Sequence, residues 1–590
     1  MDNATLARLL SETGDLLEIS GGDSFRIRSY RRAAEAAEQS TIDLAAVAGD
    51  LARLLAVPGI GKGMAANIQA AAATGSIPLR DELLGRYSAG ILDLLKLPGM
   101  GPKTIALLWD ATKIASIDQL AEAIDAGRLA GLPRMGEKQI EKLRRGIDEF
   151  RKSAGRFRID EAEESAARVI EYLLAFEGGS GGVARVTTAG SLRRGRETAG
   201  DLDLLVTGPA CEPDKAAAVV EYTANYPGIR DMIARGENKV SFYLGNSLQV
   251  DVRLLPSASY GAALQYFTGS KMHNVTLRQR ALKMGYTLSE WALARLNDGP
   301  EGPAGSVIAA ETEESIYQAL GMDWMAPEIR ENLGEIEASA RHQLPRLIQQ
   351  SDLCGDVHMH THATDGHNSI REMADAALER GYQYIAITDH SKNLAMTNGL
   401  NEERALEHIR QIRQVDREME GRIRVYTGIE VDILGDGQLD LPDYVLAEMD
   451  VVIASVHTLF NQPKEEMTAR VLRAIENPYT RILGHPTGRL LLRREPFSID
   501  LPAILRRAAE LGVAVEHNAA PERLDLSDRD LRLAKELGCK IVINTDAHST
   551  RHLDKMKYGI RQLRRAWLTA PDVLNTLAAE AFLAALRPRP

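Results

Sequence analysis

Residues 188–206 read TAGSLRRGRETAGDLDLLV, and this stretch decides how the middle of the chain folds. Its apolar end predicts a strand, on which Asp201 and Asp203 are two positions apart and therefore project from the same face. A turn at Gly190 and Ser191 precedes them, with backbone and hydroxyl groups suited to terminal phosphates, and Arg194 adds positive charge. The stretch predicts two carboxylates beside a phosphate-binding turn.

A second predicted strand, residues 248–255, brings a third carboxylate, Asp251, alongside the first two. Three carboxylates so placed hold two Mg²⁺ ions about 3.5–4 Å apart, which stabilise the entering and leaving oxygens of phosphoryl transfer. Acidic pairs are common in surface turns, so an Asp-x-Asp pair by itself is weak evidence. The preceding Gly-Ser turn and the third aspartate among valines favour the catalytic interpretation.

The first 150 residues are helical by pattern and contain two copies of a glycine-rich hairpin, at residues 54–63 and 95–103. The glycines allow a tight turn whose backbone N–H groups, at the start of the second helix, face a phosphate. This pattern is typical of helix-hairpin-helix binding to the DNA backbone without base readout. A single copy is more often a plain connector, but two close copies favour DNA binding. The predicted contacts are Gly59, Gly61, Gly99 and Gly101.

Residues 25–32 place four arginines and a tyrosine on one short helical stretch. One interpretation is a solvated basic face. The other is a pocket for a DNA strand end, in which arginines bind phosphate and a tyrosine stacks on a base. Arg26 and Tyr30 are the predicted contacts of the second interpretation.

Length and composition limit the possible classes of protein. The 590 residues exceed one folding unit and predict three to five domains. A formal charge of −11 argues against a general polyanion binder, and 44% hydrophobic with 26% charged residues excludes wholesale disorder. We find no long apolar run, no secretory signal pattern and no CxxC pair among the three cysteines. We expect a monomeric, cytoplasmic and nucleoid-associated protein without membrane contacts.

The last third of the chain alternates short apolar runs with helical segments. Seven runs predict strands at residues 356–360, 384–390, 425–431, 451–457, 481–485, 513–517 and 541–548. Such alternation implies parallel strands with right-handed crossovers, and seven repeats favour a barrel. Ten of the 13 histidines fall between His358 and His548, which indicates a site for chemistry in this region.

Many of these histidines stand at the ends of predicted strands. The carboxyl ends of parallel barrel strands surround one mouth, so residues far apart in sequence meet there. Imidazole and carboxylate groups without sulfur suit Zn²⁺, Mn²⁺ or Fe²⁺. The predicted ligands are His358, His360, Asp365, His390, Glu430, His457, His485, Asp546 and His548, whereas His362, His367, His408, His517 and His552 are predicted not to be ligands.

Residues 1–325 resemble a family X DNA polymerase of the polymerase beta kind, because the family motif Gly-Ser-x-Arg-Arg-Gly…Gly-Asp-x-Asp matches the residues from Gly190 to Asp203. The resemblance implies that Asp201, Asp203 and Asp251 bind two Mg²⁺ or Mn²⁺ ions, and that the third aspartate activates the primer 3′-hydroxyl. It also implies nucleotide contacts by Gly190, Ser191, Arg194, Arg158, Tyr266, Phe267, Gly269 and Asn274, and DNA contacts by Arg253 and Arg278. Without the family motif, Tyr266 and Phe267 could also be ordinary residues of a hydrophobic core.

The chain departs from that family at two positions. The serine expected before Gly-Asp-x-Asp is Ala199, so one phosphate contact is missing. The lysine that forms a Schiff base in the lyase domain of polymerase beta is replaced by Asn67, and an amide cannot form an imine. We therefore predict weak or absent deoxyribose-phosphate lyase activity by that route, which a high yield of borohydride-trapped DNA adduct would contradict.

Residues 353–575 resemble a polymerase and histidinol phosphatase (PHP) domain, through Asp-x-His-x-His, Thr-Asp-His, Gly-x-Glu, Ser-x-His, Gly-His-Pro and Asn-Thr-Asp-Ala-His. The resemblance implies a distorted seven-stranded α/β barrel that cleaves phosphoesters. It also implies up to three ions of Mn²⁺, Zn²⁺ or Fe²⁺ on nine ligands, and nine candidates are present. Asp432 and Asp389 are further candidates, either as supports of these ligands or as replacements for one of them.

These patterns predict a multidomain chain of α and α/β parts. The expected domains are 1–90 (N-terminal helix-hairpin-helix), 91–155 (second helix-hairpin-helix subdomain), 156–256 (nucleotidyltransferase palm with a mixed sheet), 257–325 (nucleotide selection), 326–350 (linker) and 351–590 (seven-stranded PHP barrel). This order resembles that of bacterial and archaeal family X polymerases.

The resemblance implies a DNA-directed DNA polymerase that fills short gaps in DNA repair, joined to a 3′–5′ exonuclease or 3′-end phosphoesterase. Its expected partners are gapped or primer–template DNA and deoxynucleoside triphosphates. Two alternatives stay open at this point. One is a phosphoesterase whose polymerase half is only a DNA clamp, and the other is a non-catalytic scaffold that bridges DNA ends.

Overall fold

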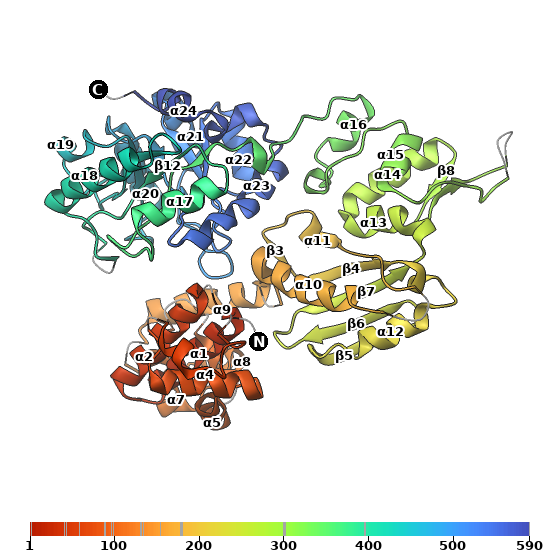
Figure 1. Ribbon diagram of the computed structural model, residues 1–590, viewed down its shortest axis with the longest axis horizontal. Coiled ribbons are helices and arrows are strands. Elements are labelled where there is room, and N and C mark those ends of the chain that lie inside the picture. Colours follow the sequence, from red (N-terminus) through yellow and green to blue (C-terminus); the bar gives the residue numbers. More distant parts are fainter. Residues whose placement is uncertain are drawn as a thin grey trace. The chain divides into compact units, whose positions relative to one another are not determined.

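The computed structural model describes residues 1, 3–40, 42, 44–57, 59–87, 90–95, 97, 100–129, 132–133, 135–153, 155–177, 181–298, 303–394 and 397–588. The chain forms two compact units, Met1–Ala154 and Gly155–Pro590. The first is helical, and the second contains a mixed sheet and a parallel barrel (Figure 1). The predicted fold class is confirmed. Across the described part of the chain, no helix combines the length and hydrophobicity needed to cross a lipid bilayer.

The N-terminal unit consists of short helices around an aliphatic core. Leu6, Leu10 and Leu17 of the first helix are buried, because their spacing of four and seven residues places them on one helical face. The helices are α1 (Asn3–Ile19), α2 (Ser24–Gln39), α3 (Leu51–Leu55), α4 (Lys62–Thr74), α5 (Pro78–Tyr87), α6 (Ile91–Leu94), α7 (Pro102–Thr112), α8 (Ile117–Asp125) and α9 (Glu137–Ser153).

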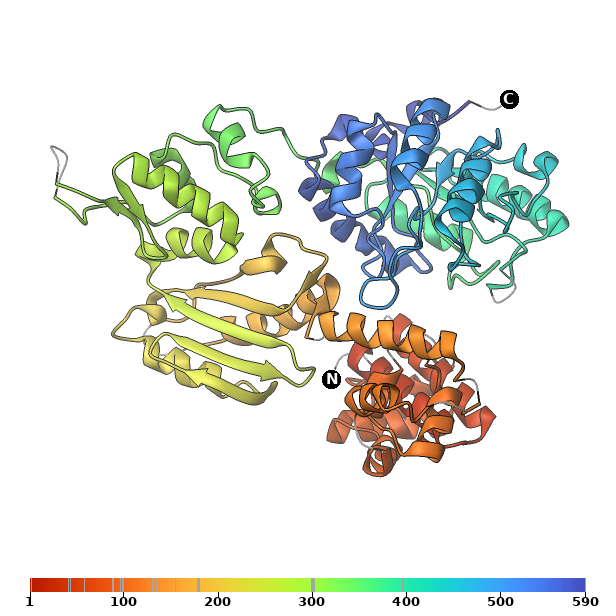
Figure 2. The same ribbon diagram turned by 180° about the vertical axis from the view of Figure 1, so that it is seen from behind.

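The palm is a five-stranded sheet in the order β2-β4-β7-β6-β5. Its strands are β2 (Arg185–Thr188), β4 (Asp201–Thr207), β5 (Ile229–Arg235), β6 (Lys239–Leu244) and β7 (Gln249–Leu255). The pair β4–β7 is parallel and the other pairs are antiparallel, so the sheet is mixed. Helices α10 (Ile159–Leu174) and α12 (Ala216–Ala224) pack with Leu202 and Leu204 of β4 on one face. Figure 2 shows the opposite face, to which the odd-numbered residues of β4 project.

The next subdomain packs α13 (Tyr260–Thr268), α14 (Lys271–Lys283) and α15 (Glu313–Ala319) with an antiparallel sheet of β8 (Tyr286–Leu288), β9 (Leu293–Arg295) and β10 (Val307–Ala309). Helix α16 (Glu335–Ala340) falls within the predicted linker. Ile329 and Ile336 of that segment are buried in the same core as Leu277 and Ile316. The first part of the predicted linker therefore packs as part of this subdomain.

The C-terminal domain is a nearly closed parallel barrel of seven strands in sequential order. A parallel bridge between Met359 and Ala547 joins the segments that follow its first and last strands. The strands are β11 (Gly355–Asp356), β12 (Tyr384–Ile387), β13 (Arg424–Asp432), β14 (Val451–Ser455), β15 (Ile482–Leu483), β16 (Ala514–Asn518) and β17 (Ile541–Asn544). Helices α17 (Ile370–Glu379), α18 (Glu402–Glu418), α20 (Lys464–Glu476), α21 (Leu501–Leu511), α22 (Asp528–Glu536) and α23 (Met556–Arg565) lie between or after them.

Alternation along these strands separates an outer core from the barrel interior. Ile385 and Ile429 belong to the outer core, while Tyr384 and Tyr426 belong to the inner one. The C-terminal helix α24 (Ala579–Ala585) contributes Phe582 to the inner core, stacked on Tyr384 with ring centroids 4.8 Å apart. Further along the strands, the same interior parity is occupied by polar residues: Glu430, Asp432, Ser455, Glu516 and Asn544. The interior is thus apolar at one end and polar at the carboxyl ends of the strands.

Candidate active sites

Two neighbouring strands of the palm bring three aspartates together. Asp201 and Asp203 lie on β4 and Asp251 on β7, and the parallel register pairs Asp203 with Asp251. Burial, followed by the charges of Asp201 and Asp251, raises the pKa of Asp203 to about 6. Oδ1 of Asp251 is buried without a hydrogen bond to the described residues, and Oδ2 lies 3.2 Å from Nζ of Lys239. Mutually repelling carboxylates around an unbonded oxygen fit the all-oxygen ligation of Mg²⁺ or Mn²⁺.

Gly190 begins the short helix α11 (Gly190–Arg193) beside this cluster. Its φ is +57°, and a Cβ at this position would lie 2.5 Å from Oδ2 of Asp203. The N–H of Ala189 donates to the carbonyl oxygen of Asp203 at 2.8 Å, which fixes the turn against β4. Glycine is required here because a side chain would displace the carboxylate.

A cavity of about 510 Å³ opens next to the carboxylates. Three arginines beside a serine turn supply the charge and donors that a triphosphate needs. The predicted contacts Ser191 and Arg194 line this cavity. Its full lining is Arg156, Ser191, Arg194, Arg196, Gly200, Asp201, Gln249 and Glu331.

Arg158 was the predicted phosphate contact at this end of the palm, but the cavity is lined by Arg156. The Arg158 guanidinium binds the Asp160 carboxylate through two hydrogen bonds, of 3.1 and 3.0 Å. Arg156 was not among the predicted contacts, although it lines the cavity. The two arginines flank Phe157 with the same strand parity, so alternation along β1 (Phe157–Arg158) does not distinguish them.

The residues predicted to face the nucleotide sugar and the template form one cluster. The Tyr266 and Phe267 rings meet edge to face with centroids 5.0 Å apart. The guanidinium of Arg278 lies 4.9 Å from the Tyr266 ring centre, and that of Arg253 lies 4.3 Å from the Phe267 ring centre. Nδ2 of Asn274 donates to the carbonyl oxygen of Tyr266 at 2.7 Å. An arginine side chain therefore lies against each of the two aromatic rings.

Gly269 connects this cluster to the cavity. A Cβ there would lie 3.1 Å from Nη1 of Arg194, and the same Nη1 donates to the carbonyl oxygen of Thr268 at 2.6 Å. The predicted nucleotide contacts other than Arg158 therefore lie in one continuous region.

At the carboxyl ends of the barrel strands, the nine predicted metal ligands lie close together. Three groups of ligand atoms are each compact enough for one ion: His360, Asp365, His390 and His548; His358, His360 and Asp546; and His390, Glu430 and His457. His485 joins them through Nε2, which lies 2.9 Å from Oε1 of Glu430. Because His360 and His390 each belong to two groups, the three sites adjoin one another.

Glu430 is the central carboxylate of this cluster. Its Oε2 lies 3.0 Å from Nδ1 of His390 and 3.4 Å from Nε2 of His358, and its Oε1 lies 3.2 Å from Nε2 of His457. Burial by itself would raise the pKa of Glu430, but the charges of His457, His358 and His390 lower it well below its usual range. The carboxylate therefore stays ionised and available as a ligand.

Several ring nitrogens of the cluster are buried without a hydrogen-bond partner among the described residues. They are Nε2 of His358, Nδ1 of His360 and Nδ1 of His485. Buried polar atoms are usually bonded, and an unbonded one is costly unless another group occupies the site. Orphaned imidazole nitrogens around ionised carboxylates fit a cluster of Zn²⁺, Mn²⁺ or Fe²⁺ ions.

Carboxylates behind the ligands hold their imidazole rings. Oε1 of Glu516 lies 2.7 Å from Nδ1 of His358, and Oε2 accepts the backbone N–H of His485 at 2.8 Å. Oδ1 of Asp432 lies 2.5 Å from Nδ1 of His457. Such pairs orient metal-bound imidazoles and raise their basicity. Sequence reasoning named Asp432 but missed Glu516, although its place on the interior parity of β16 was an available signal.

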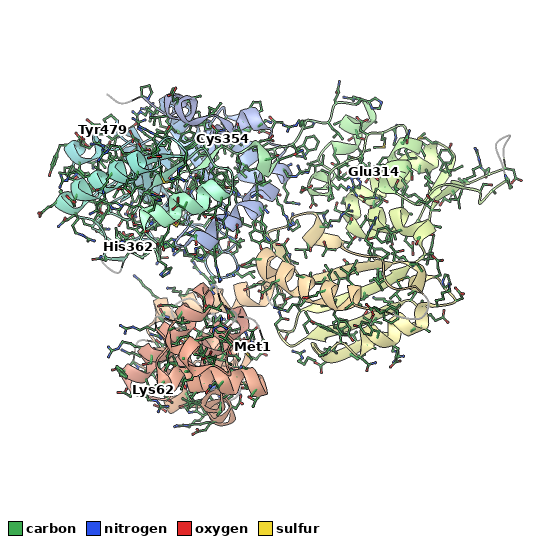
Figure 3. The ribbon with its side chains drawn as sticks, in the orientation of Figure 1. Met1, Lys62, Glu314, Cys354, His362 and Tyr479 are labelled. Carbon is green, nitrogen blue, oxygen red and sulfur yellow. The ribbon has the colours of Figure 1, made fainter. Side chains whose placement is uncertain are left out.

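The five histidines predicted not to be ligands lie outside the three groups of described ligand atoms. Nε2 of His408 lies 2.8 Å from Oδ2 of Asp389, whose Oδ1 accepts the N–H of Thr361 at 2.8 Å. Asp389 thus supports the strand ends. Nδ1 of His517 donates to the carbonyl oxygen of Leu526, and Nδ1 of His552 accepts the N–H of His548. His362, labelled in Figure 3, and His367 are exposed.

The hairpin glycines lie at the starts of two helices of the N-terminal unit. Gly61 precedes α4 and Gly101 precedes α7, and a glycine cap leaves the first N–H groups of a helix without a side-chain partner. Gly59 has φ +93°, and a Cβ there would lie 3.2 Å from the carbonyl oxygen of Arg32. The first residue of α4, Lys62, is exposed (Figure 3). Gly99 lies outside the described residues.

The two residues predicted to contact the end of a DNA strand differ in exposure. Arg26 is exposed near the start of α2, whereas Tyr30 is 2% exposed. The Tyr30 ring packs in the helical core, so no base can stack on it in this conformation. Asn67 of α4 donates from Nδ2 to the carbonyl oxygen of Gly63 at 3.0 Å.

Family models match four segments of the chain. They are a helix-hairpin-helix domain at residues 1–77, a SAM-like helix-hairpin-helix tandem at 91–149, the DNA polymerase beta thumb at 263–331 and the PHP domain at 356–496. The DNA polymerase/3′-5′ exonuclease PolX of Bacillus subtilis (strain 168) is 37% identical over 588 residues, which cover 99% of this chain and 99% of that protein. The chain belongs to the bacterial family X DNA polymerases with a C-terminal PHP domain. The predicted family is therefore confirmed.

Other proteins match only part of this family X polymerase. A probable phosphatase of Thermoanaerobacter sp. (strain X514) is 30% identical over 233 residues, which cover 38% of this chain and 89% of that protein. A ternary complex of Leishmania infantum polymerase beta is 24% identical with a TM-score of 0.27, and the match covers 41% of this chain and 98% of that one. The assignment of the family rests on the full-length match.

Proposed function

We propose that the chain is a DNA-directed DNA polymerase that fills short gaps during DNA repair, and that its PHP barrel removes nucleotides or blocking groups from 3′ ends. The observation that carries this proposal is the presence of two separate clusters in one chain, three aspartates in the palm and nine candidate metal ligands in the barrel. The full-length similarity to a protein named for both activities supports the pairing. The substrates would be deoxynucleoside triphosphates and gapped or primer–template DNA, and the place of action would be the cytoplasm at the nucleoid.

In the palm, Ser191, Arg194 and Arg156 are the proposed contacts of the triphosphate, because they line the cavity beside the carboxylates. Asp201 and Asp203, with Asp251, would hold two ions of Mg²⁺ or Mn²⁺. When bound, these ions supply the positive charge that stabilises phosphoryl transfer. The unbonded Oδ1 of Asp251 is the proposed acceptor for the proton of the primer 3′-hydroxyl.

In the barrel, the nine ligands would hold up to three ions of Mn²⁺, Zn²⁺ or Fe²⁺, which supply Lewis acidity for phosphoester cleavage when bound. Glu516 and Asp432 would orient His358 and His457 toward these ions. The glycine-capped helices α4 and α7 are the proposed contacts of the DNA backbone.

Separate inactivation of the two clusters tests the proposal. The double variant Asp201→Ala with Asp203→Ala should lower single-nucleotide extension on gapped DNA more than about 10³-fold and leave 3′ digestion within about twofold, because only the palm loses its charge. His358→Ala should do the reverse. Loss of both activities in either folded variant would contradict the two-site proposal.

The alternatives predict different results with the unmodified protein. A phosphoesterase with a DNA clamp would digest 3′ ends but fail to extend a gapped primer. A scaffold would bridge DNA ends without a stoichiometric metal cluster, which metal analysis of the purified protein would reveal.

A further inference from the structure

The loop that follows α11, residues 194–197, carries two arginines of the phosphate cavity and is bonded to the C-terminal domain. Arg194 and Arg196 both line the cavity. Three side chains of the barrel domain hold this loop: Nη1 of Arg565 donates to the carbonyl oxygen of Arg194 at 2.8 Å, Nε2 of Gln562 donates to that of Gly195 at 2.7 Å, and Nη2 of Arg489 lies 2.6 Å from Oε1 of Glu197. Side chains of the barrel domain therefore hold a loop that lines the polymerase cavity.

Glu331 links the loop of the cavity to the barrel domain. It lines the same cavity, where a carboxylate repels a triphosphate. Its Oε1 accepts hydrogen bonds from Nε of Arg194 at 3.1 Å and from Nη1 of Arg565 at 2.9 Å. One carboxylate is thus shared by an arginine of the cavity and an arginine of the barrel domain.

Arg565 lies near the end of α23, coloured blue in Figure 1, and is 3% exposed. Its Nε and Nη2 bind Oδ2 of Asp528 at 2.9 and 2.7 Å. One edge of the guanidinium is therefore anchored within the barrel domain, and the other faces Glu331 and the loop. A planar guanidinium makes both sets of bonds at once, which a lysine cannot do. None of these described bonds involves a ligand of the barrel cluster.

We propose that Arg565 is a positioning residue for nucleotide binding by the polymerase, which balances the charge of Glu331 and so leaves the Arg194 guanidinium available to the triphosphate. The inference rests on the proposed role of Arg194 as a triphosphate contact. Without Arg565, Glu331 has one cationic partner fewer, and its charge is directed at Arg194 and the incoming nucleotide. Without the Glu331 charge, Arg565 is no longer needed for this purpose. The two substitutions should therefore have opposite effects.

Single-nucleotide extension by the full-length protein on gapped DNA tests this. Arg565→Met should raise the KM for the deoxynucleoside triphosphate about tenfold, the effect of one charge-assisted hydrogen bond, with kcat within about threefold. Glu331→Gln should keep KM at or below that of the unmodified protein. The double variant should return KM to within about threefold of Glu331→Gln, a rescue that a merely structural role would not give.

Three results would overturn the inference: an unchanged KM in Arg565→Met, a double variant as impaired as Arg565→Met, or a raised KM in Glu331→Gln. Digestion of 3′ ends should be unaffected in Arg565→Met and reports that the protein is folded. If that variant does not fold, Arg565→Lys replaces it, with an intermediate rise in KM expected and an unchanged KM contradicting the inference.

Arg194→Ala separates the inference from the proposed function. If this variant raises KM while Arg565→Met does not, the inference fails and the triphosphate site stands. If Arg194→Ala leaves KM unchanged, the proposed triphosphate contact is wrong, and the role of Arg565 falls with it.

Discussion

Replacing Gly190 by alanine tests whether the turn before α11 determines the position of a catalytic carboxylate. A Cβ at this position would lie 2.5 Å from Oδ2 of Asp203, and a relaxed contact is about 3.5 Å, so the carboxylate must move by roughly 1 Å. A displacement of that size at a reacting centre costs about 10²-fold in rate, or about 2.7 kcal/mol. We expect kcat for single-nucleotide extension at saturating Mg²⁺ to fall by this factor, with a smaller change in the KM for nucleotide.

Gly285→Ala is the matched control, because Gly285 also has a positive φ, of +80°, but a Cβ there would meet no atom within 4 Å. It therefore carries the backbone strain, about 1 kcal/mol, without the collision. Digestion of 3′ ends reports that both variants are folded. A kcat of Gly190→Ala within about threefold of that of Gly285→Ala would refute the reasoning, since the turn would then not constrain Asp203.

Three further predictions concern side chains whose roles the tertiary structure indicates. Glu516→Gln should weaken metal binding by the barrel about 10–100-fold, because it removes the charge behind His358, and a Mn²⁺ titration of 3′ digestion should show the shift; an unaltered titration would contradict this role. Arg156→Ala should raise the KM for nucleotide about tenfold, whereas Arg158→Ala should leave it within about twofold; the opposite ranking in an extension assay would contradict the assignment. Burial lowers the pKa of His517 to about 3, so the unfolded chain binds a proton below about pH 6.5 while the folded chain does not, and stability is lost as the pH falls through that value. His517→Gln should remove about 2 kcal/mol of the loss between pH 7.5 and 5, seen as a smaller drop in melting temperature, and an equal drop in both proteins would argue against this cause.

Much of the candidate site could be predicted from the sequence because its parts are local. Asp201 and Asp203 share a face since side chains alternate along any strand, and the same holds for His358 and His360. Glycines such as Gly61 identify a turn before a helix, whatever surrounds it. The order of strands and helices in the last third of the chain was enough to predict a parallel barrel, because crossover connections follow few rules.

Other features depend on contacts between residues far apart in the chain. The pairing of Asp251 with Asp203 is a matter of strand register, and Glu516 supports His358 across the barrel interior. Because Tyr30 is buried, its ring cannot stack on a base, a role that the arginine-rich stretch of residues 25–32 suggested.

Only the tertiary structure shows that Arg156 lines the cavity while Arg158 pairs with Asp160, and that Arg194 and Arg565 share Glu331. Sequence periodicity reports which way a side chain points within its own helix or strand. Which distant charge it meets depends on how the domains pack, and a charged residue has the same local pattern whether its partner is solvent, a phosphate or another side chain.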